Sequence, residues 1–487
     1  MKRLSTFVIC MVLVTAALAA CGTPPTSNPS AQNTTASGNA ATAAAPATGA
    51  TTAATMAAAT APAAGTGATT AATGAGATTA ATSGAATGGT TATAGAAPAT
   101  GSGSGSGGII KIWSSLPRQG ASKDQSDAIV NAIKLRLDDA GNKVCNGQFT
   151  IQYEDKDDAT AAAGKWDPAA ETANAQAAVA DPDVMVYIGT FNSGAAKLSM
   201  PILNQANLVM ISPANTYTGL TKPGKGEAGE PEKYFPNGKR NYTRVVTADD
   251  VQGGAAAQWA KDMGLKTVYI LDDQEVYGKG VADVFESTAT QLGIQKLGHQ
   301  GIDPKASDYR ALATTITSQN PDLVYFGGIV DNNAAQLLKD LRSVGYKGKF
   351  MGPDGINVDT MISGAGDAAE GIYATQAGTP PEQLGPNGKG YLDKYQKKYG
   401  QAPASYGIYG YDAAGAALQA LNNACKKDRV AIRDAVFAIK NFDGALGKWS
   451  FDQNGDTTLA TIVGYQAQGG KWVPIMYFNN GKWQKLK

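Results

Sequence analysis

Short apolar runs of strand length alternate with helical patterns along the chain from residue 109 onward. The helical patterns include Ile129, Ile133 and Leu137, which repeat at four-residue spacing after a polar start. The strand-length runs are residues 109–113, 149–153, 184–188, 208–211, 267–271, 323–326 and 349–351. Strands that alternate with helices form βαβ units, and near-continuous apolar strands are typical of parallel sheets. The sequence therefore predicts an α/β fold.

Length and charge limit the possible partners. Residues 109–487 are long enough for two lobes. The net charge of the whole chain is only +1, so no basic field favours a nucleic-acid partner. His299 is the only histidine, and Cys145 and Cys425 are the only cysteines after residue 21. We therefore expect no Cys/His metal site.

The N-terminus has the pattern of an export signal. Lys2 and Arg3 precede an apolar run over residues 7–20, which is shorter than the roughly 20 apolar residues that span a bilayer. The run ends in Leu18-Ala19-Ala20-Cys21, which resembles the lipobox of bacterial lipoproteins. The pattern predicts a signal peptide at 1–20 and a lipid on Cys21 that anchors the protein to the outer face of the cell membrane. A chance cysteine at the end of an apolar run is the alternative.

The segment at 21–108 differs in composition from the rest of the chain. After Cys21 it is almost entirely Ala, Thr, Gly, Ser and Pro, without any charged residue, and Met56 is its only large apolar side chain. Such a segment buries too little apolar surface to offset the entropy of ordering it, so we expect a disordered tether. A flexible coil of this length has a reach of roughly 50 Å, enough to hold a folded module away from a membrane.

Polar residues follow several of the predicted strands. In open parallel sheets, ligands bind beyond the carboxyl ends of the strands. Residues 189–194 and 212–217 are small and polar there, and they offer hydroxyl and backbone N–H groups to a carboxylate. Two other strands lead to Asp354 and Tyr277. One side thus offers anion-binding groups and the other a carboxylate and an aromatic ring, an arrangement that fits a zwitterion.

At these residues the chain resembles the periplasmic leucine/isoleucine/valine-binding proteins, the type I substrate-binding proteins of ABC importers. Six segments in the family's order carry the resemblance: Val186-Tyr187-Ile188-Gly189, Met210-Ile211-Ser212-Pro213, Tyr277-Gly278-Lys279-Gly280, Tyr325-Phe326-Gly327-Gly328, Phe350-Met351-Gly352-Pro353-Asp354-Gly355 and Gly366-Asp367-Ala368-Ala369-Glu370-Gly371. Each segment alone is weak, but together they cover essentially all of the chain after residue 109.

The resemblance implies two Rossmann-like lobes with parallel sheets, joined by three crossovers, that close on a ligand like a Venus flytrap. It places the crossovers near 246–248, 373–377 and 446–449. The first lobe would then combine 109–247 with 378–446, and the second lobe would combine 248–377 with 447–487.

The resemblance also assigns roles to five residues. Ser193 and the hydroxyl of Thr216 would hold the ligand's carboxylate, and Ala214 would contribute a backbone contact. Tyr277 would reach in from the second lobe, and Asp354 would take the ligand's ammonium. From the residues alone, other roles stay open: Ser193 and Thr216 are also typical helix caps, Asp354 also suits a turn, and Tyr277 also suits simple packing.

Two departures from the family limit the choice of ligand. Ile329 stands where leucine-type binders place a tyrosine, and the family's first-loop tyrosine is replaced within residues 122–125. Amino-acid binding is therefore better supported than branched-chain selectivity. Relatives of this fold also bind amides, urea and aromatic acids, and these ligands stay open.

The two remaining cysteines have a predicted pairing. In a lobe of this topology the first and last helices lie on one face and run parallel, which would bring Cys145 close to Cys425. The export route permits a disulfide, with free thiols as the alternative.

These features favour a binding protein that delivers an amino acid to an ABC permease. Catalysis needs a positioned acid, base or nucleophile, but His299 lies in an apparent surface stretch and no Gly-x-Ser-x-Gly motif accompanies it. No phosphate-binding loop suggests a cofactor. We therefore expect no enzyme, no cofactor and no catalytic residue. A ligand-sensing surface receptor of the same fold is the alternative function.

Overall fold

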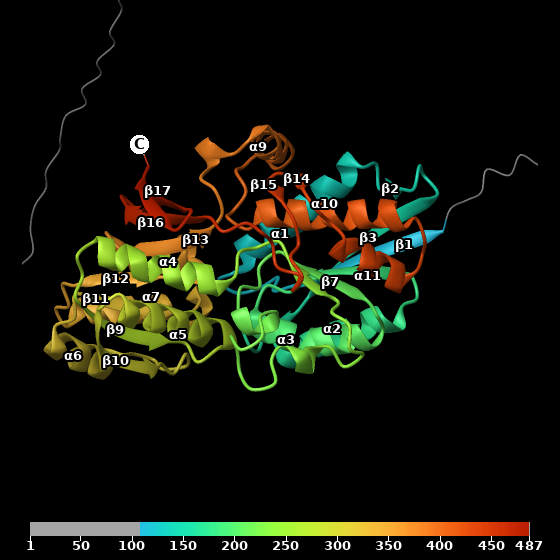
Figure 1. Cartoon of the computed structure of the whole chain (residues 1–487). Helices are drawn as coiled ribbons and strands as arrows, with labels where there is room; N and C mark the ends of the chain where they lie inside the picture. Colours follow the sequence, from blue (N-terminus) through green and yellow to red (C-terminus); the bar gives the residue numbers. More distant parts are fainter. Residues whose placement is uncertain (1–107, 487) are drawn as a thin grey trace, which may run out of the picture. The chain divides into compact units, whose positions relative to one another are not determined.

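The computed structural model describes residues 108–486, which Figure 1 shows as helices and strands. The predicted signal peptide at 1–20, the predicted lipidation site Cys21 and nearly all of the predicted tether at 21–108 lie outside the described residues. Within residues 108–486, no helix combines the length and the apolar character needed to cross a membrane.

The first sheet has six strands in the spatial order β2-β3-β1-β6-β7-β8. They are β1 (Ile109–Leu116), β2 (Lys143–Val144), β3 (Phe149–Asp157), β6 (Val184–Gly189), β7 (Val209–Ser212) and β8 (Tyr242–Arg244). All neighbours pair in parallel except β2, which pairs antiparallel with β3. Every residue of β6 is buried, as expected for a strand that helices cover on both faces.

Helices lie on both faces of the first sheet (Figure 1). They are α1 (Lys123–Asp139), α2 (Pro168–Ala180), α3 (Ser193–Gln205), α10 (Gly407–Ala424) and α11 (Arg429–Phe437). The α9 helix (Pro386–Tyr399) packs on the outer side of α1 and α10 instead. Around β7 the side chains alternate between the two faces. Val209 and Ile211 pack with α1, α10 and α11, whereas Leu208 and Met210 pack with α2 and α3. This alternation is the two-residue period of a strand.

The second sheet has eight strands in the order β10-β9-β11-β12-β13-β16-β17-β18. They are β9 (Thr267–Asp272), β10 (Gln295–Gly301), β11 (Leu323–Gly327), β12 (Lys349–Gly352), β13 (Tyr373–Ala377), β16 (Ile462–Gln468), β17 (Lys471–Asn479) and β18 (Lys482–Lys485). The strands from β10 to β13 are parallel, and β16, β17 and β18 extend the sheet as antiparallel strands.

Helices also cover both faces of the second sheet. They are α4 (Asp249–Asp262), α5 (Val276–Gln291), α6 (Arg310–Gln319), α7 (Ala334–Ser343) and α8 (Asp359–Ala365). The α4 and α5 helices pack with Ile270 and Leu323 in one core cluster, and the other three helices pack with Leu271 and Val324 in another. Short 3-10 helices complete the loops: η1 (Thr218–Leu220), η2 (Glu232–Tyr234), η3 (Val330–Asn332), η4 (Asp354–Ile356), η5 (Gly366–Ala369) and η6 (Pro381–Gln383).

The predicted α/β class and the two parallel sheets are confirmed. All seven strand-length runs of the sequence lie in strands of the structure. Several other strands were missed, among them β10, in which Gln295, Lys296 and Gln300 are exposed. Because β10 is an edge strand with exposed residues, its sequence lacks the apolar run that reveals a buried strand.

The chain passes between the two sheets three times. It leaves the first sheet between β8 and α4, and it returns after β13 to form α9, α10 and α11 beside the first sheet. The last passage comes later than the predicted 446–449, because β15 (Gly447–Trp449) pairs with β14 (Phe442–Gly444) and Trp449 packs in the core of the first sheet. These contacts favour placing 447–459 with the first lobe, and we keep all of the lobe boundaries as a proposal.

Candidate functional site

The five residues predicted to bind ligand line a single cavity. Ser193, Ala214, Thr216, Tyr277 and Asp354 surround a small cavity of about 20 Å³. The other lining residues are Phe191, Asn192, Ile329, Gly355 and Tyr406. The segments that follow the carboxyl ends of β6, β7, β11 and β12 therefore meet at this cavity, which is where parallel sheets bind ligands. That these residues bind a ligand stays a prediction.

The first-lobe side of the cavity is the N-terminus of α3. Ser193 is the first residue of this helix, and no side chain caps it, so Ser193 does not have the capping role that its residue type permits. The backbone N–H groups of Ser193 and Gly194 point out of the first turn, where a helix has no internal acceptors. The Ser193 hydroxyl oxygen accepts from the Tyr217 backbone N–H at 3.3 Å, which leaves its proton free to be donated.

The second-lobe side centres on Asp354, which is only 3% exposed. The Tyr277 hydroxyl donates to its Oδ1 at 2.8 Å, and the Tyr406 hydroxyl and the Gln252 side-chain amide also donate to this carboxylate. Burial raises the pKa of Asp354, and the hydrogen bonds from Tyr406, Tyr277 and Gln252 only partly oppose this. Although Asp354 begins the turn η4, its side chain is part of the cavity wall.

Asp249, a residue that sequence reasoning missed, lies close behind the cavity. It is the first residue of α4 and is completely buried. Burial and the charge of Asp354 raise its pKa well above the ordinary value, whereas the nearby Thr216 hydroxyl and the charge of Arg244 lower it. No described donor reaches either carboxylate oxygen with hydrogen-bond geometry. Because Asp354 raises the pKa of Asp249 despite Arg244, a further cation beside Asp354 makes it easier for both buried acids to be charged.

Tyr406 and Gln252 also escaped prediction. Tyr406 precedes α10 and Gln252 lies in α4, so neither follows a predicted strand. Phe191 lies in a predicted loop but had no assigned role, and its ring contacts that of Tyr406 edge-on at 5.4 Å. None of residues 122–125, where the family's first-loop tyrosine is replaced, lines the cavity.

Polar contacts join the two lobes beside the cavity. Asp331 of η3 accepts from the backbone N–H groups of Ala121 at 2.7 Å and Ser122 at 3.3 Å, and from the Ser122 hydroxyl. Lys165 of β5 (Lys165–Trp166), which pairs with β4 (Ala159–Thr160), donates to Glu275 and Asn332, each at 2.6 Å. These contacts hold the lobes together around the site.

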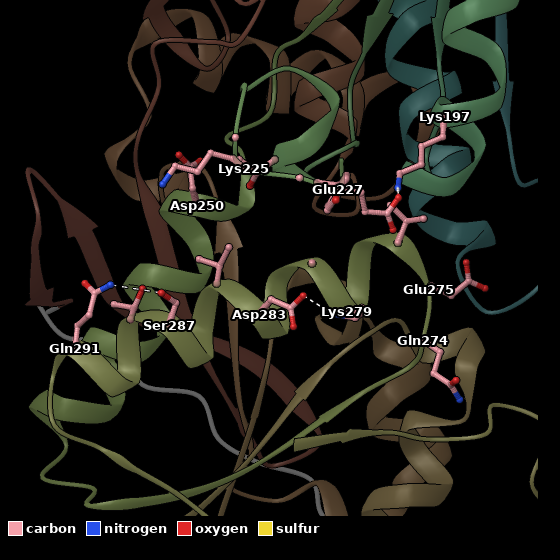
Figure 2. Close-up of a pocket in the computed structure, with 18 residues that line it drawn as sticks. Lys197, Lys225, Glu227, Asp250, Gln274, Glu275, Lys279, Asp283, Ser287 and Gln291 are labelled. Carbon is pink, nitrogen blue, oxygen red and sulfur yellow. Dashed lines mark hydrogen bonds and ion pairs between the residues drawn. The ribbon is translucent and has the colours of Figure 1, made fainter. Parts of the chain in front are cut away.

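A larger open pocket lies between residues 217–227 and α5, and Figure 2 shows its side chains. Lys197 pairs with Glu227 at 3.3 Å on one side of it, and Lys279 pairs with Asp283 at 2.5 Å on α5. It shares no lining residue with the cavity at Asp354. Because most of its charges are paired and open to solvent, they offer less to a ligand than the buried groups around Asp354.

The cysteines lie as the disulfide prediction requires. The Cα atoms of Cys145 and Cys425 are 5.5 Å apart and the structure joins their sulfurs, a spacing within the range of about 4.4–6.8 Å seen in disulfides. The bond stays a prediction that a thiol assay of the unfolded protein, with and without reductant, would test.

Comparison with known proteins agrees with this architecture. A family model for periplasmic binding proteins matches residues 109–471. The Leu/Ile/Val-binding protein homolog 1 of Brucella abortus (strain 2308) is 28% identical over 288 residues, which are 59% of this chain and 73% of that protein.

Solved structures give the same result. The leucine binding protein LivK from Thermotoga maritima superimposes with a TM-score of 0.67 at 25% identity, covering 76% of this chain and 99% of that one. A solute binding protein from R. palustris in complex with benzoate shares the fold with a TM-score of 0.62 at 19% identity, covering 75% of this chain and 95% of that one. The chain therefore belongs to the periplasmic binding protein family, as a type I member of its branched-chain amino acid group, and is a solute-binding protein and not an enzyme.

Proposed function

We propose that this protein is the extracytoplasmic substrate-binding lipoprotein of an ABC importer, and that it captures an amino acid between its lobes and delivers it to a permease. The observation that carries the proposal is that the N-terminus of α3 and the buried Asp354 line the same cavity. The carboxylate of a zwitterion would bind at the N-terminus of α3, and its ammonium would bind Asp354. The names of the relatives support the ligand class, and the description of the R. palustris neighbour as part of an ABC transporter supports the transporter partner.

The first-lobe groups suit a carboxylate. The free N–H groups at the start of α3 and the positive end of the helix dipole favour an anion. The hydroxyls of Ser193 and Thr216 lie beside them in the cavity wall and add donors. Together they replace the water that a carboxylate loses when it enters the cavity.

The second-lobe groups suit an ammonium. No Lys, Arg or His is among the residues that line the cavity, and the carboxyls of Asp354 and Asp249 are both buried. Buried acids without a cation are costly, so an incoming ammonium beside Asp354 stabilises the site. Phe191 and Ile329 offer apolar surface to an aliphatic side chain, which favours a branched-chain amino acid.

An aromatic acid is the second candidate ligand, because a structural neighbour holds benzoate. Benzoate has no ammonium, and its negative charge would come close to Asp354. It would bind only while Asp354 is protonated, a state that its raised pKa favours. Benzoate affinity would then increase as the pH falls.

The location follows from the family, and the anchor from the sequence. Periplasmic binding proteins act outside the cytoplasm, and the Cys21 motif supports a lipid that holds the protein beside its permease. Mass spectrometry of the N-terminal peptide from native membranes would show a lipid-modified Cys21. An unmodified Met1 N-terminus would contradict the anchor.

The test of the proposed ligand measures the contributions of its carboxylate and its ammonium separately. Isothermal titration with leucine, 4-methylpentanoate and isoamylamine compares a zwitterion with analogues that lack the ammonium or the carboxylate. We expect leucine to bind at least about tenfold more tightly than either analogue, since each analogue leaves one buried group unpaired. Equal affinity for 4-methylpentanoate, or binding of benzoate alone, would replace the amino-acid proposal with an acid-binding one.

A further inference from the structure

A second pocket lies next to β13, the last strand before the chain returns to the first lobe. This pocket, which we call the hinge cavity, is partly open and has a volume of about 100 Å³. Its walls come from β13 and β16 of the second sheet, from the segment that follows β13, and from α9 and the start of α10. It has no lining residue in common with the cavity at Asp354, so it is a separate site.

Three residues of its wall each carry a buried polar atom that has no hydrogen-bond partner within residues 108–486. These atoms are the side-chain amide nitrogen of Gln376 and the hydroxyl oxygens of Tyr391 and Tyr409. These side chains are only 3%, 1% and 2% exposed. Folded proteins pair nearly all of their buried polar groups, so three unpaired groups around one cavity point to a polar occupant.

The unused donors and acceptors of these side chains define what an occupant must offer if they turn toward it. The Asn357 amide donates to the Gln376 side-chain oxygen at 3.4 Å, which leaves the Gln376 nitrogen as a donor without an acceptor. Burial raises the pKa of Tyr391 and of Tyr409, so both hydroxyls stay neutral. An occupant with a carbonyl or hydroxyl oxygen accepts from Gln376 and bonds with a tyrosine hydroxyl.

The rest of the wall excludes charge. No Asp, Glu, Lys, Arg or His lines the hinge cavity, and Leu384, Ile408 and Val463 are among its apolar residues. An ion buried there would lose its hydration without gaining a counter-ion. A wall that is largely apolar with a few polar groups is the usual composition of a small-molecule site.

The neighbouring crevice also disfavours anions. It shares Pro381, Ser405 and Tyr465 with the hinge cavity, and its other lining residues include Asp124 and Asp359 but no Lys, Arg or His. A negative surface at this approach repels carboxylates. Amino acids and aromatic acids are thus poor occupants of the hinge cavity, in contrast to the cavity at Asp354.

We propose that the hinge cavity is a second ligand site for a small neutral molecule that has an apolar body and a carbonyl or hydroxyl oxygen, such as a short aliphatic amide or alcohol. The walls of the hinge cavity come from both lobes, so a molecule bound there stabilises the lobe arrangement that brings these walls into contact with it. Its binding is therefore coupled to the lobe arrangement that the transport ligand requires.

The test locates a probe through the methyl groups of the protein. NMR spectra of the full chain, labelled on Ile, Leu and Val methyls, are recorded with isobutyramide and with isobutyrate, which has the same shape but a charge. We expect isobutyramide to shift the methyl signals of Leu384, Ile408 and Val463, and isobutyrate to leave them unchanged. Shifts confined to Ile329 in the other cavity, no shifts at all, or an equal response to isobutyrate would overturn the proposal.

A pair of matched variants tests the hydrogen bonds. Tyr409→Phe removes one unpaired hydroxyl and keeps the ring, and we expect about fivefold weaker binding of isobutyramide. Tyr399→Phe makes the same change in α9 at a hydroxyl that donates to the Asn131 carbonyl at 2.8 Å outside the cavity, and we expect no change. Unaltered affinity in Tyr409→Phe would overturn the proposal. If Tyr409→Phe does not fold, Tyr391→Phe is used in its place, with the same expected result.

Discussion

Two buried carboxylates lie near the junction of the lobes, and they differ in the charge of their partners. Asp456 is 4% exposed and pairs with the guanidinium of Arg244, whose Nε lies 2.7 Å from its Oδ1. Asp354 is 3% exposed and accepts only from neutral groups, the hydroxyls of Tyr277 and Tyr406 and the amide of Gln252.

The pKa values of the two acids move in opposite directions. Burial alone raises the pKa of each. At Asp456 the charge and hydrogen bond of Arg244 outweigh burial and leave the pKa below its usual value of 3.8. At Asp354 the neutral donors do not outweigh burial, and the pKa stays above 3.8.

The comparison shows how a structural acid differs from an acid that awaits a ligand. The charge of Asp456 is neutralised within the chain, so this ion pair holds β8 to the segment before β16. The charge of Asp354 is neutralised by no described residue, and its side chain lines a cavity. A buried acid with a perturbed pKa in a cavity is a typical functional group.

The largest expected effect is the loss of the structural pair. Arg244→Met leaves Asp456 buried without a cation, and we expect the free energy of unfolding to fall by about 3–5 kcal/mol. Urea denaturation followed by circular dichroism measures this loss. Arg240→Met is the control, because Arg240 is only half-buried and its guanidinium donates to the carbonyls of Thr221 and Asn454 rather than to an acid. Similar losses in both variants would mean that the ion pair has no special role.

Truncation of the cavity acid should affect binding more than folding. Asp354→Ala strands the ligand's ammonium, so we expect leucine binding to weaken by about 2–4 kcal/mol. The free energy of unfolding without ligand should fall less than in Arg244→Met, because Asp354 has no ionic partner to lose, although Tyr277, Tyr406 and Gln252 lose their acceptor. Isothermal titration and urea denaturation measure the two quantities. Asp283→Ala removes an exposed acid of α5, paired only with Lys279, and should alter neither.

The sequence predicted the cavity because its residues follow strands. Ser193, Thr216 and Asp354 each come after an apolar run, and the carboxyl ends of parallel strands meet at one edge of a sheet. The family resemblance then linked these positions to a carboxylate and an ammonium. Both inferences rest on local order along the chain, which a sequence displays directly.

The partners of the acids could not be predicted in this way. Arg244 and Asp456 are 212 positions apart, and Gln252 and Asp354 are 102 apart, so each contact depends on how distant segments of one lobe pack together. Asp249 has the common pattern of an acid in the first turn of a helix, and nothing in the sequence shows that it is buried. The late third passage between sheets was missed for a similar reason, since the indole of Trp449 donates to Asp412 of α10 at 3.0 Å.

The pH dependence of leucine binding should show that the ionisation of Asp354 controls the affinity. An ammonium binds the ionised form of Asp354, so below the raised pKa of this residue the leucine affinity should fall by about tenfold per pH unit. Titrations over a pH series measure this slope. Asp354→Asn, which cannot ionise, should bind leucine weakly and show a flat profile. A steep slope in this variant would mean that another group, such as Asp249, controls the dependence.

In the ligand-free protein, the contributions of Asp456 and Asp354 to the free energy of unfolding should change with pH in opposite directions. The folded pKa of Asp456 is lowered, so its contribution is present above the unfolded value of about 3.8 and is lost as the pH falls through the folded pKa. The folded pKa of Asp354 is raised, so its contribution is lost as the pH rises from 3.8 through the raised value. Unfolding of Asp456→Asn and Asp354→Asn over the same pH series would resolve the two contributions.

The smallest expected effect belongs to Asp249. Its carboxyl has no described hydrogen-bond donor, and burial with the charge of Asp354 holds its pKa well above the usual value. Asp249→Asn replaces a carboxyl whose charged form burial and Asp354 disfavour with an amide of the same shape, so the free energy of unfolding should change by less than about 1 kcal/mol. Asp456→Asn makes the same substitution in the ion pair and should lose more. Equal losses in the two variants, measured by urea denaturation at neutral pH, would mean that Arg244 stabilises the charge of Asp249 as well as that of Asp456, and that the acids around the cavity do not await a cation from a ligand.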